Sequence, residues 1–154
     1  MEIVDLLTEE RVVDQLHAAS KKQVIQEISK RAAAVTGLDE RAVFDVLLER
    51  ERLGTTGVGK GVAIPHGKTV ELNGLYGLFA RLDQPIDFDE IDDQPVDLVF
   101  LLLAPEGAGA DHLKALARVS RLLRDPAVCE SLRDAADADA LYTILTADAR
   151  RSAA

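Results

Sequence analysis

The feature that most constrains the fold is a continuous apolar run, Leu98–Ala104. A strand with one face in water alternates apolar and polar residues, whereas a strand covered on both faces is apolar throughout. The run therefore predicts a central β-strand over residues 96–104, with packed layers above and below it. Residues 62–64 and 75–82 are expected to add further strands.

Helix start and stop signals surround these strands. Ser20, followed three residues later by Gln23, is a capping-box pattern, and helical spacing of apolar residues then continues to Gly37. A second helix is expected from about Asp39 to just before Gly54. Because helices precede, interrupt and follow the strands, the sheet should lie between helical layers, as in an α/β (α+β-like) protein. Three further aspartates are expected to cap later helices: Asp111, Asp125 and Asp137.

The chain is expected to form one domain over residues 1–154. Its length suits a single core, and no repeat, low-complexity block or linker divides it. Residues 150–154 have the composition of a frayed tail. The single cysteine, Cys129, cannot form an internal disulfide or a multi-cysteine metal site, so we expect it to be a small, semi-buried apolar residue.

The composition argues against two classes of partner. A net charge of −9 disfavours binding to phosphate backbones and to anionic lipid, and the absence of tryptophan leaves few side chains to stack on bases. The first twenty residues have no basic start or long apolar run, and the run at 98–104 is too short to span a bilayer. We therefore expect a cytoplasmic protein that binds no nucleic acid and does not insert into a membrane.

The glycine-rich segment Gly54–Lys60 has the spacing of a nucleotide-binding P-loop. The following hydroxyl that would hold magnesium is missing, because that position is Gly61. A P-loop also leads from a strand into a helix, whereas this segment is expected to lead from a helix into a strand. The dinucleotide fingerprint fails as well, since Val62 stands where its third glycine is needed. We therefore expect a turn here, without a bound nucleotide.

That segment leads directly to His66, which stands between Pro65 and Gly67. Proline fixes φ on one side of the histidine, and glycine permits unusual dihedral angles on the other, so the ring is expected to be presented on a loop. Near pH 7 a neutral imidazole can act as a nucleophile. His66 is therefore the first candidate for covalent chemistry, with a purely structural role as the alternative.

Two other histidines and one arginine complete the set of candidates. His17 is expected near the end of a first helix, as a surface or capping residue. His112 lies at the start of a later helix, where free N–H groups favour an anion, although ordinary first-turn polarity explains it equally well. Arg50 precedes the glycine-rich segment and is either the cation of a site or an exposed residue favoured by the helix dipole.

These residue types point to phosphoryl transfer. The histidines lack metal-ligand spacing, and the sequence contains no Cys/His cluster and no serine-hydrolase elbow. The simplest remaining chemistry is covalent catalysis by one imidazole, with a second imidazole and a cation nearby. A phosphoryl group needs only an in-line nucleophile and positive or N–H donors for its oxygens. We therefore expect no metal and no other cofactor.

The segment Arg50–Lys68 resembles the active-site signature of the IIA proteins of the mannitol/fructose class, most closely their nitrogen-regulatory members. These proteins belong to the bacterial phosphoenolpyruvate-dependent phosphotransferase system. The chain length, the apolar strand at 96–104 and the later segment 111–113 also fit, so the resemblance covers nearly the whole chain. It implies the mannitol-class IIA fold, a single mixed β-sheet flanked by helices on both sides.

The resemblance also implies roles for individual residues. His66 would accept a phosphoryl group at Nε2 from a phosphohistidine on an HPr-like carrier protein. His112 would orient or donate to that group, Arg50 would neutralise its charge, and Thr56 would supply a nearby hydroxyl. Lys60 departs from the asparagine that is usual in the family, and is expected to add positive charge beside the site.

Three functions are open at this point. The favoured one is a regulatory phosphocarrier whose two charge states bind different targets, such as sensor kinases or potassium transport components in nitrogen, potassium or carbon regulation. A second is the IIA component of fructose or mannitol uptake, which would pass phosphate to a IIB domain. The third is a binding module that is never phosphorylated, and the joint presence of His66, His112 and Arg50 argues against it.

Overall fold

The computed structural model describes residues 1–147. Within this range one mixed sheet runs in the order β1-β5-β6-β3-β2, and β4 also pairs with β6. β5 and β6 are antiparallel, whereas β1 is parallel to β5, and β3 and β4 are parallel to β6. The six strands are β1 (Val12–Leu16), β2 (Gly57–Gly59), β3 (Val62–Ala63), β4 (His66–Thr69), β5 (Tyr76–Ile86) and β6 (Val96–Pro105).

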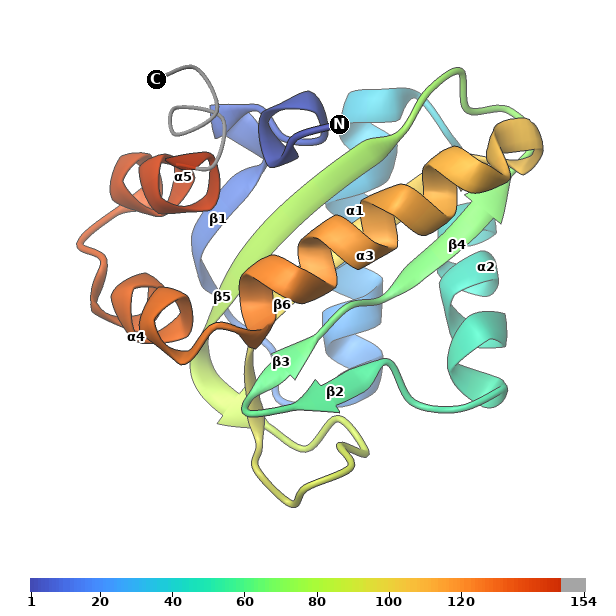
Figure 1. The fold of residues 1–154 in the computed structure, drawn as a ribbon. Helices are drawn as coiled ribbons and strands as arrows, with labels where there is room; N and C mark the ends of the chain where they lie inside the picture. The colour runs from blue at the N-terminus through green and yellow to red at the C-terminus, as the bar shows by residue number, and fades with distance from the viewer. Residues whose placement is uncertain (148–154) are drawn as a thin grey trace.

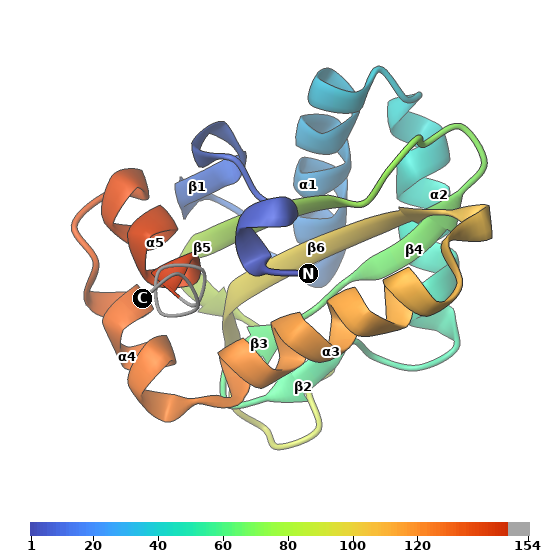
Figure 2. The ribbon, with the colours of Figure 1, turned by 45° about the horizontal axis from the view of Figure 1, so that its top comes forward.

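Helices cover both faces of this sheet (Figures 1 and 2). One face carries α1 and α2, and α3 crosses the other face, in front of β6 in Figure 1. The expected α/β class, with helices on both sides of a mixed sheet, is confirmed. No helix within residues 1–147 is both long and apolar enough to cross a membrane. The helices are α1 (Lys21–Thr36), α2 (Glu40–Arg52), α3 (Ala110–Arg124), α4 (Pro126–Asp134) and α5 (Ala138–Leu145), with short 3-10 turns at η1 (Ile3–Asp5), η2 (Glu9–Arg11) and η3 (Glu106–Ala108).

Strand β6 divides the core into two layers. Its side chains alternate: Val99, Leu101 and Leu103 pack with residues of α1 and α2. The intervening Leu98, Phe100 and Leu102 pack with residues of α3, α4 and α5. Residues 98–104 are all fully buried, which confirms the prediction of a strand covered on both faces.

Most of the predicted helix caps are present. The Ser20 hydroxyl accepts the Gln23 N–H, although the Gln23 side chain accepts from Ala19 and so does not complete the reciprocal box. Gly37 ends α1 in the left-handed conformation, at φ 77°. Side chains also cap α2, α4 and α5: Asp39, Asp125 and Asp137.

The expected cap at Asp111 is wrong. Helix α3 begins two residues earlier than that cap would imply, at Ala110, and its N-cap is Gly109 at φ 49° with no side-chain cap. Glycine adopts this positive φ without steric cost, so the chain can turn sharply from η3 into α3. Asp111 instead lies in the first turn, where its negative charge is favourable to the helix dipole.

Two further expectations, one about a helix and one about a turn, also need correction. The first helix expected to end near His17 does not form: residues 12–16 are the strand β1, whose β-branched Val12 and Val13 pair in parallel with β5. The strand expected over 62–64 is present as β3, but the segment Gly54–Lys60 is more than a turn, because it contains β2, which pairs with β3. His66 opens β4. The tail expected over 150–154 lies outside the described residues.

Candidate functional site

His66 is the first residue of β4 and pairs with Leu102 of β6, so it lies on a strand and not on the expected loop. Because paired residues in this register point to the same side of a sheet, the His66 side chain faces the α3 layer, as Leu102 does. Within residues 1–147 β4 pairs only with β6, so it is an edge strand. Groups from both helical layers can therefore reach the ring.

Gly67 brings α2 close to the opposite side of β4. A Cβ atom at this position would stand 2.4 Å from Cγ1 of Val46, which is closer than real Cβ contacts allow. A side chain at 67 would therefore push α2 away from the strand. Glycine at 67 permits the close approach that places Arg50, near the end of α2, beside His66.

Both ring nitrogens of His66 are engaged. Nδ1 lies 2.8 Å from the Ile64 carbonyl oxygen, and Nε2 lies 3.2 Å from Nε of Arg50. A carbonyl oxygen can only accept, so Nδ1 carries the proton and donates it to Ile64. Nε2 then holds a lone pair and accepts from Arg50, whose Nη1 also donates to the Gly54 carbonyl at 2.9 Å. Nε2 is thus the nitrogen that could act as a nucleophile, and a cation stands beside it.

His112 completes a pair of imidazoles. It is the third residue of α3, is only 6% exposed, and meets His66 edge to face with ring centroids 5.9 Å apart. Its Nε2 is buried and has no hydrogen-bond partner in the part of the chain that the structure describes. Buried polar atoms are nearly always paired, so an unpaired one at such a place indicates a group that a ligand can satisfy.

Both histidines are biased toward the neutral form. Burial lowers the pKa of His66 below its usual value of 6.5, the Arg50 charge lowers it further, and the hydrogen bond to Ile64 and the charge of Glu51 oppose the shift. Burial also lowers the pKa of His112, with smaller contributions from the charges of His66 and Lys68. A neutral imidazole has the lone pair that a nucleophile needs, so the site suits attack near pH 7.

Lys68 is a cation that the sequence analysis missed. It stands two residues after His66 on β4 and so lies on the same face of the strand, where its exposed ammonium acts on His112. Side chains two residues apart on a strand lie on the same face, so Lys68 would have been expected beside His66 if β4 had been predicted as a strand.

Thr56 lies in a buried network next to the site. Its N–H donates to Oε1 of Glu51 at 3.0 Å, and its hydroxyl donates to the other oxygen of that carboxylate. Lys21 pairs with Glu51 at 3.0 Å. The Thr56 carbonyl in turn accepts the Ile64 N–H at 2.9 Å. Thr56 is therefore linked to His66 through Ile64, and the sequence analysis missed Glu51 as the centre of this network.

Lys60 is not beside the site, contrary to expectation. It occupies the turn between β2 and β3, and along β6 the partners of Val62 and His66 are Leu98 and Leu102. Four residues of strand at about 3.3 Å each place the turn roughly 13 Å or more from His66. Lys60 has φ 58°, a left-handed conformation that asparagine tolerates better than lysine, which gives a backbone reason for the asparagine expected there.

The remaining candidates lie elsewhere. His17 is exposed and bonds to Asp83 at 2.9 Å, which agrees with a surface role. Cys129 is buried, as expected, and its thiol donates to the Leu123 carbonyl. Among residues 1–147, no three His, Cys, Asp or Glu side chains are grouped so that they could hold a metal ion.

The chain is similar to a known family and to proteins of known structure. A family model described as "Phosphoenolpyruvate-dependent sugar phosphotransferase system, EIIA 2" matches residues 5–148. A nitrogen regulatory protein of Bradyrhizobium diazoefficiens is 62% identical over 145 residues, which cover 94% of this chain and 95% of that protein.

Two solved structures have the same fold. Nitrogen regulatory protein IIA-Ntr from Neisseria meningitidis superposes with a TM-score of 0.89 at 35% identity, covering 94% of this chain and 99% of that one. IIA mannitol from Escherichia coli gives a TM-score of 0.75 at 25% identity, over 90% of this chain and 98% of that one. The chain therefore belongs to the EIIA 2 family of the phosphoenolpyruvate-dependent sugar phosphotransferase system.

Proposed function

We propose that this chain is a regulatory phosphocarrier that accepts a phosphoryl group on Nε2 of His66. The observation that carries the proposal is the pair of bonds on the His66 ring, which leaves the proton on Nδ1 and a lone pair on Nε2. The donor is a phosphohistidine on an HPr-like carrier. In the transfer a bond forms between Nε2 and phosphorus, the N–P bond of the donor breaks, and the donor imidazole keeps the electron pair.

The surrounding residues have complementary roles in this proposal. Arg50 offsets the charge of the phosphoryl oxygens, with Lys68 as a second cation. His112 donates from its ring to a phosphoryl oxygen, which supplies the partner that its buried Nε2 lacks in the described residues. Thr56 acts indirectly, since its carbonyl holds the Ile64 N–H and the Ile64 carbonyl holds the His66 ring. Arginine, lysine and N–H donors suffice for this chemistry, so no metal is required.

The similarity to nitrogen regulatory proteins favours regulation as the output. Phosphorylation adds a charge of about −1.5 to −2 to the surface around His66, and this change is enough to alter which partner binds there. Sensor kinases and potassium transport components are the proposed targets, in the cytoplasm, with residues 1–154 acting as one domain. The similarity to IIA mannitol supports a second candidate, a IIA component that passes phosphate to a IIB domain for fructose or mannitol uptake.

Phosphate transfer tests the proposal. The full chain is incubated with phosphoenolpyruvate and the two preceding carriers, and acid-labile phosphate is mapped by mass spectrometry. We expect label on His66, none on His66→Ala, and unchanged labelling of His17→Ala, a histidine outside the site. The absence of label on a folded wild-type chain with active carriers would favour the unphosphorylated binding module.

The His112→Ala variant tests the second imidazole. We expect a folded protein that is labelled on His66 more slowly, by about 10²–10⁴-fold if His112 supplies a proton or hydrogen bond in the transition state. The measurement is a single-turnover time course with phosphorylated carrier. A wild-type rate would remove His112 from the mechanism.

A chase separates regulation from transport. Phosphorylated chain is mixed with a fructose- or mannitol-specific IIB domain, and the loss of label from His66 is followed. Rapid and stoichiometric transfer to IIB supports the uptake role. Retention of label, together with phosphorylation-dependent binding to a regulatory target, supports the regulatory role.

A further inference from the structure

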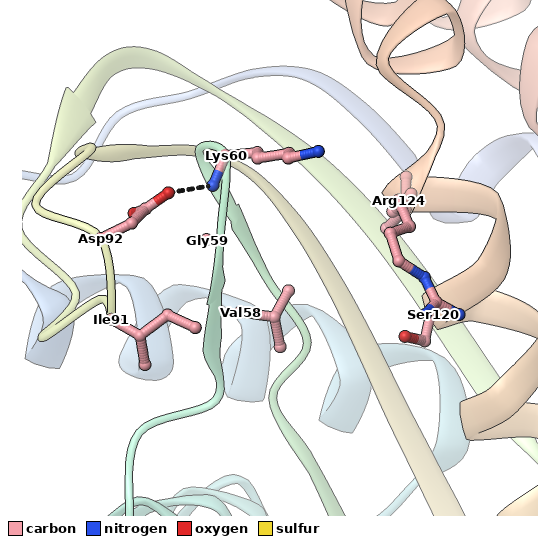
Figure 3. Close-up of a pocket in the computed structure, with 8 residues that line it drawn as sticks. Val58, Gly59, Lys60, Ile91, Asp92, Ser120 and Arg124 are labelled. Carbon is pink, nitrogen blue, oxygen red and sulfur yellow. Dashed lines mark hydrogen bonds between the residues drawn. The ribbon is translucent and has the colours of Figure 1, made fainter.

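A groove lies at the opposite end of β6 from His66, and nothing in the phosphoryl-transfer site uses it. It opens between the β2–β3 hairpin, the loop that joins β5 to β6, and the C-terminal half of α3 (Figure 3). The groove encloses about 380 Å³, a size suited to a small molecule. The residues that line it include Val58, Lys60, Ile91, Asp92, Ser120 and Arg124.

One part of this groove is apolar and exposed to solvent. Val58 is 48% exposed and Ile91 is 75% exposed, and the two side chains come from different segments of the chain. Exposing aliphatic surface to water is unfavourable in proportion to the exposed area. A ligand with an apolar body would cover both side chains and remove that cost.

The groove also holds two cations without partners. Within residues 1–147, neither the Lys60 ammonium nor the Arg124 guanidinium makes an ion pair or a side-chain hydrogen bond, whereas Arg133 nearby is engaged with Asp97. In Figure 3 the Lys60 side chain extends toward α3, which carries Arg124. Ser120 stands one helical turn before Arg124 and therefore presents its hydroxyl on the same face. These three donors line one groove in a chain whose net charge is −9.

Asp92 is the one acid among the lining residues, and its oxygens are already used. Oδ2 accepts the Lys60 N–H at 2.8 Å, and Oδ1 accepts the Gln94 N–H at 3.2 Å. The carboxylate thus fastens the β2–β3 turn to the neighbouring loop. The groove keeps a net positive charge, because Lys60 and Arg124 outnumber Asp92.

The backbone conformation of Lys60 also indicates a functional role for this residue. The residue has φ 58° and stands between Gly59 at φ 99° and Gly61 at φ 79°. Left-handed conformation is unfavourable for a residue with a Cβ atom, and such strain is concentrated at functional positions. A glycine or asparagine would relieve the strain, but only lysine or arginine places a cation at the wall of the groove.

We propose that this groove binds a small amphipathic anion. Its carboxylate or phosphoryl group lies between Lys60 and Arg124 and accepts the Ser120 hydroxyl, and its short apolar body covers Val58 and Ile91. The site is separate from His66 and does not depend on the proposed phosphorylation.

Probe binding to the full chain tests this site, with backbone amide shifts of Gly59, Asp92 and Ser120 as the readout. The probes are 4-methylpentanoate and 3-methylbutyl phosphate, which share a branched apolar body and differ in the anionic group. Inorganic phosphate lacks the apolar body, and 4-methylpentanamide lacks the charge. We expect at least one amphipathic anion to bind with a dissociation constant on the order of 1 mM, and both controls to bind about tenfold more weakly or not at all.

Each outcome of this binding experiment either supports the proposed site or contradicts it. Binding of only one amphipathic anion supports the site and identifies its anionic group. Equal binding of inorganic phosphate would remove the apolar half of the proposal, equal binding of the amide would remove the ionic half, and the absence of saturable shifts with all probes would overturn it.

The affinity of single-residue variants for the probes shows whether Lys60 and Arg124 form the site. Lys60→Asn fits the left-handed turn and Arg124→Gln is a surface change, so both should fold, and each is expected to weaken binding by about tenfold. Arg121→Gln is the matched control in the same region of α3 and should leave binding unchanged, as should His66→Ala. Equal affinity in Lys60→Asn, Arg124→Gln and wild type would contradict the proposal whatever the result at His66.

Discussion

Glu51 supports the geometry around His66 indirectly, because it holds Thr56, whose carbonyl accepts the Ile64 N–H. It is only 8% exposed and accepts both the N–H and the hydroxyl of Thr56, while its charge is paired with Lys21. Glu51→Gln removes the negative charge and puts an amide donor where acceptors are needed. We expect the free energy of unfolding to fall by about 1–3 kcal/mol, measured by urea denaturation.

The matched control for Glu51→Gln is Glu49→Gln on the same helix. Glu49 pairs with Arg52, but both side chains are about two-thirds exposed. Exposed ion pairs contribute little, so we expect a change within about 0.5 kcal/mol. Equal effects of the two substitutions would mean that the buried network does not hold the segment before His66.

Lys60 offers a gain in stability at a single residue. Its φ of 58° is unfavourable for lysine, and asparagine tolerates this region better. Lys60→Asn is therefore expected to raise the free energy of unfolding by about 0.5–1 kcal/mol, whereas Lys60→Gln, which removes only the charge, should bring no such gain. Urea denaturation of both variants measures the difference, and equal stabilities would show that backbone conformation is not the cause.

Single functional residues could be identified from the sequence where they belong to one recognisable motif. Arg50 and His66 flank one glycine-rich segment, and the structure places them in contact. His112 lies outside that segment and was identified through the family resemblance, and its ring does lie against that of His66. Glu51 and Lys68 were missed because their roles depend on contacts that the motif does not encode. The role of Glu51 becomes visible only in the folded chain, where Thr56 and Lys21 contact its carboxylate. The position of Lys68 beside His66 can be inferred only when β4 is known to be a strand.

At the scale of elements, the packing of β4 against α2 depends on Gly67. Gly67→Ala places a methyl group 2.4 Å from Cγ1 of Val46, so the strand and the helix must move apart. We expect a loss of about 1–3 kcal/mol in the free energy of unfolding. Val46→Ala should restore the space, so a double-mutant cycle is expected to show a favourable coupling of about 1 kcal/mol or more. Additive effects of the two changes would contradict this contact.

Helices were predicted from sequence more reliably than short strands. Caps are local, so Ser20, Asp39, Asp125 and Asp137 could be recognised from neighbouring residues. The strands β1, β2 and β4 have only three to five residues each, and their alternation is too short to distinguish from a turn or helix. The partners of β1 and β4 are also distant in sequence. The strand β1 was mistaken for a helix for this reason.

At the scale of the whole molecule, the two-layered core follows from β6. A strand that is apolar at every position has to be covered twice, and alternate residues of β6 do pack into the two helical layers. The order of the strands in the sheet could not be predicted from this apolar run. Both β3 and β4 pair with β6, one after the other along the same edge, and this arrangement places His66 at the end of the sheet within reach of α2 and α3.

The pair formed by the half-buried His66 and the buried His112 makes the stability of the whole molecule depend on pH. The pKa values of His66 and His112 are both lowered below 6.5, first by burial. As the pH falls below about 6.5, the unfolded chain takes up protons before the folded chain does, so the unfolded state binds more protons and folding becomes less favourable. The stabilisation is present above pH 6.5 and is lost as the pH falls through the folded-state pKa values.

We therefore expect the free energy of unfolding to decrease between about pH 7.5 and pH 5, a window above the range in which ordinary carboxylates titrate. Urea denaturation at a series of pH values measures this slope. In the double variant His66→Gln/His112→Gln the slope should flatten, and each single variant should remove part of it. Parallel curves for wild type and the double variant would mean that the two imidazoles are not kept neutral by burial, and the same result would weaken the argument that Nε2 of His66 is available as a nucleophile near neutral pH.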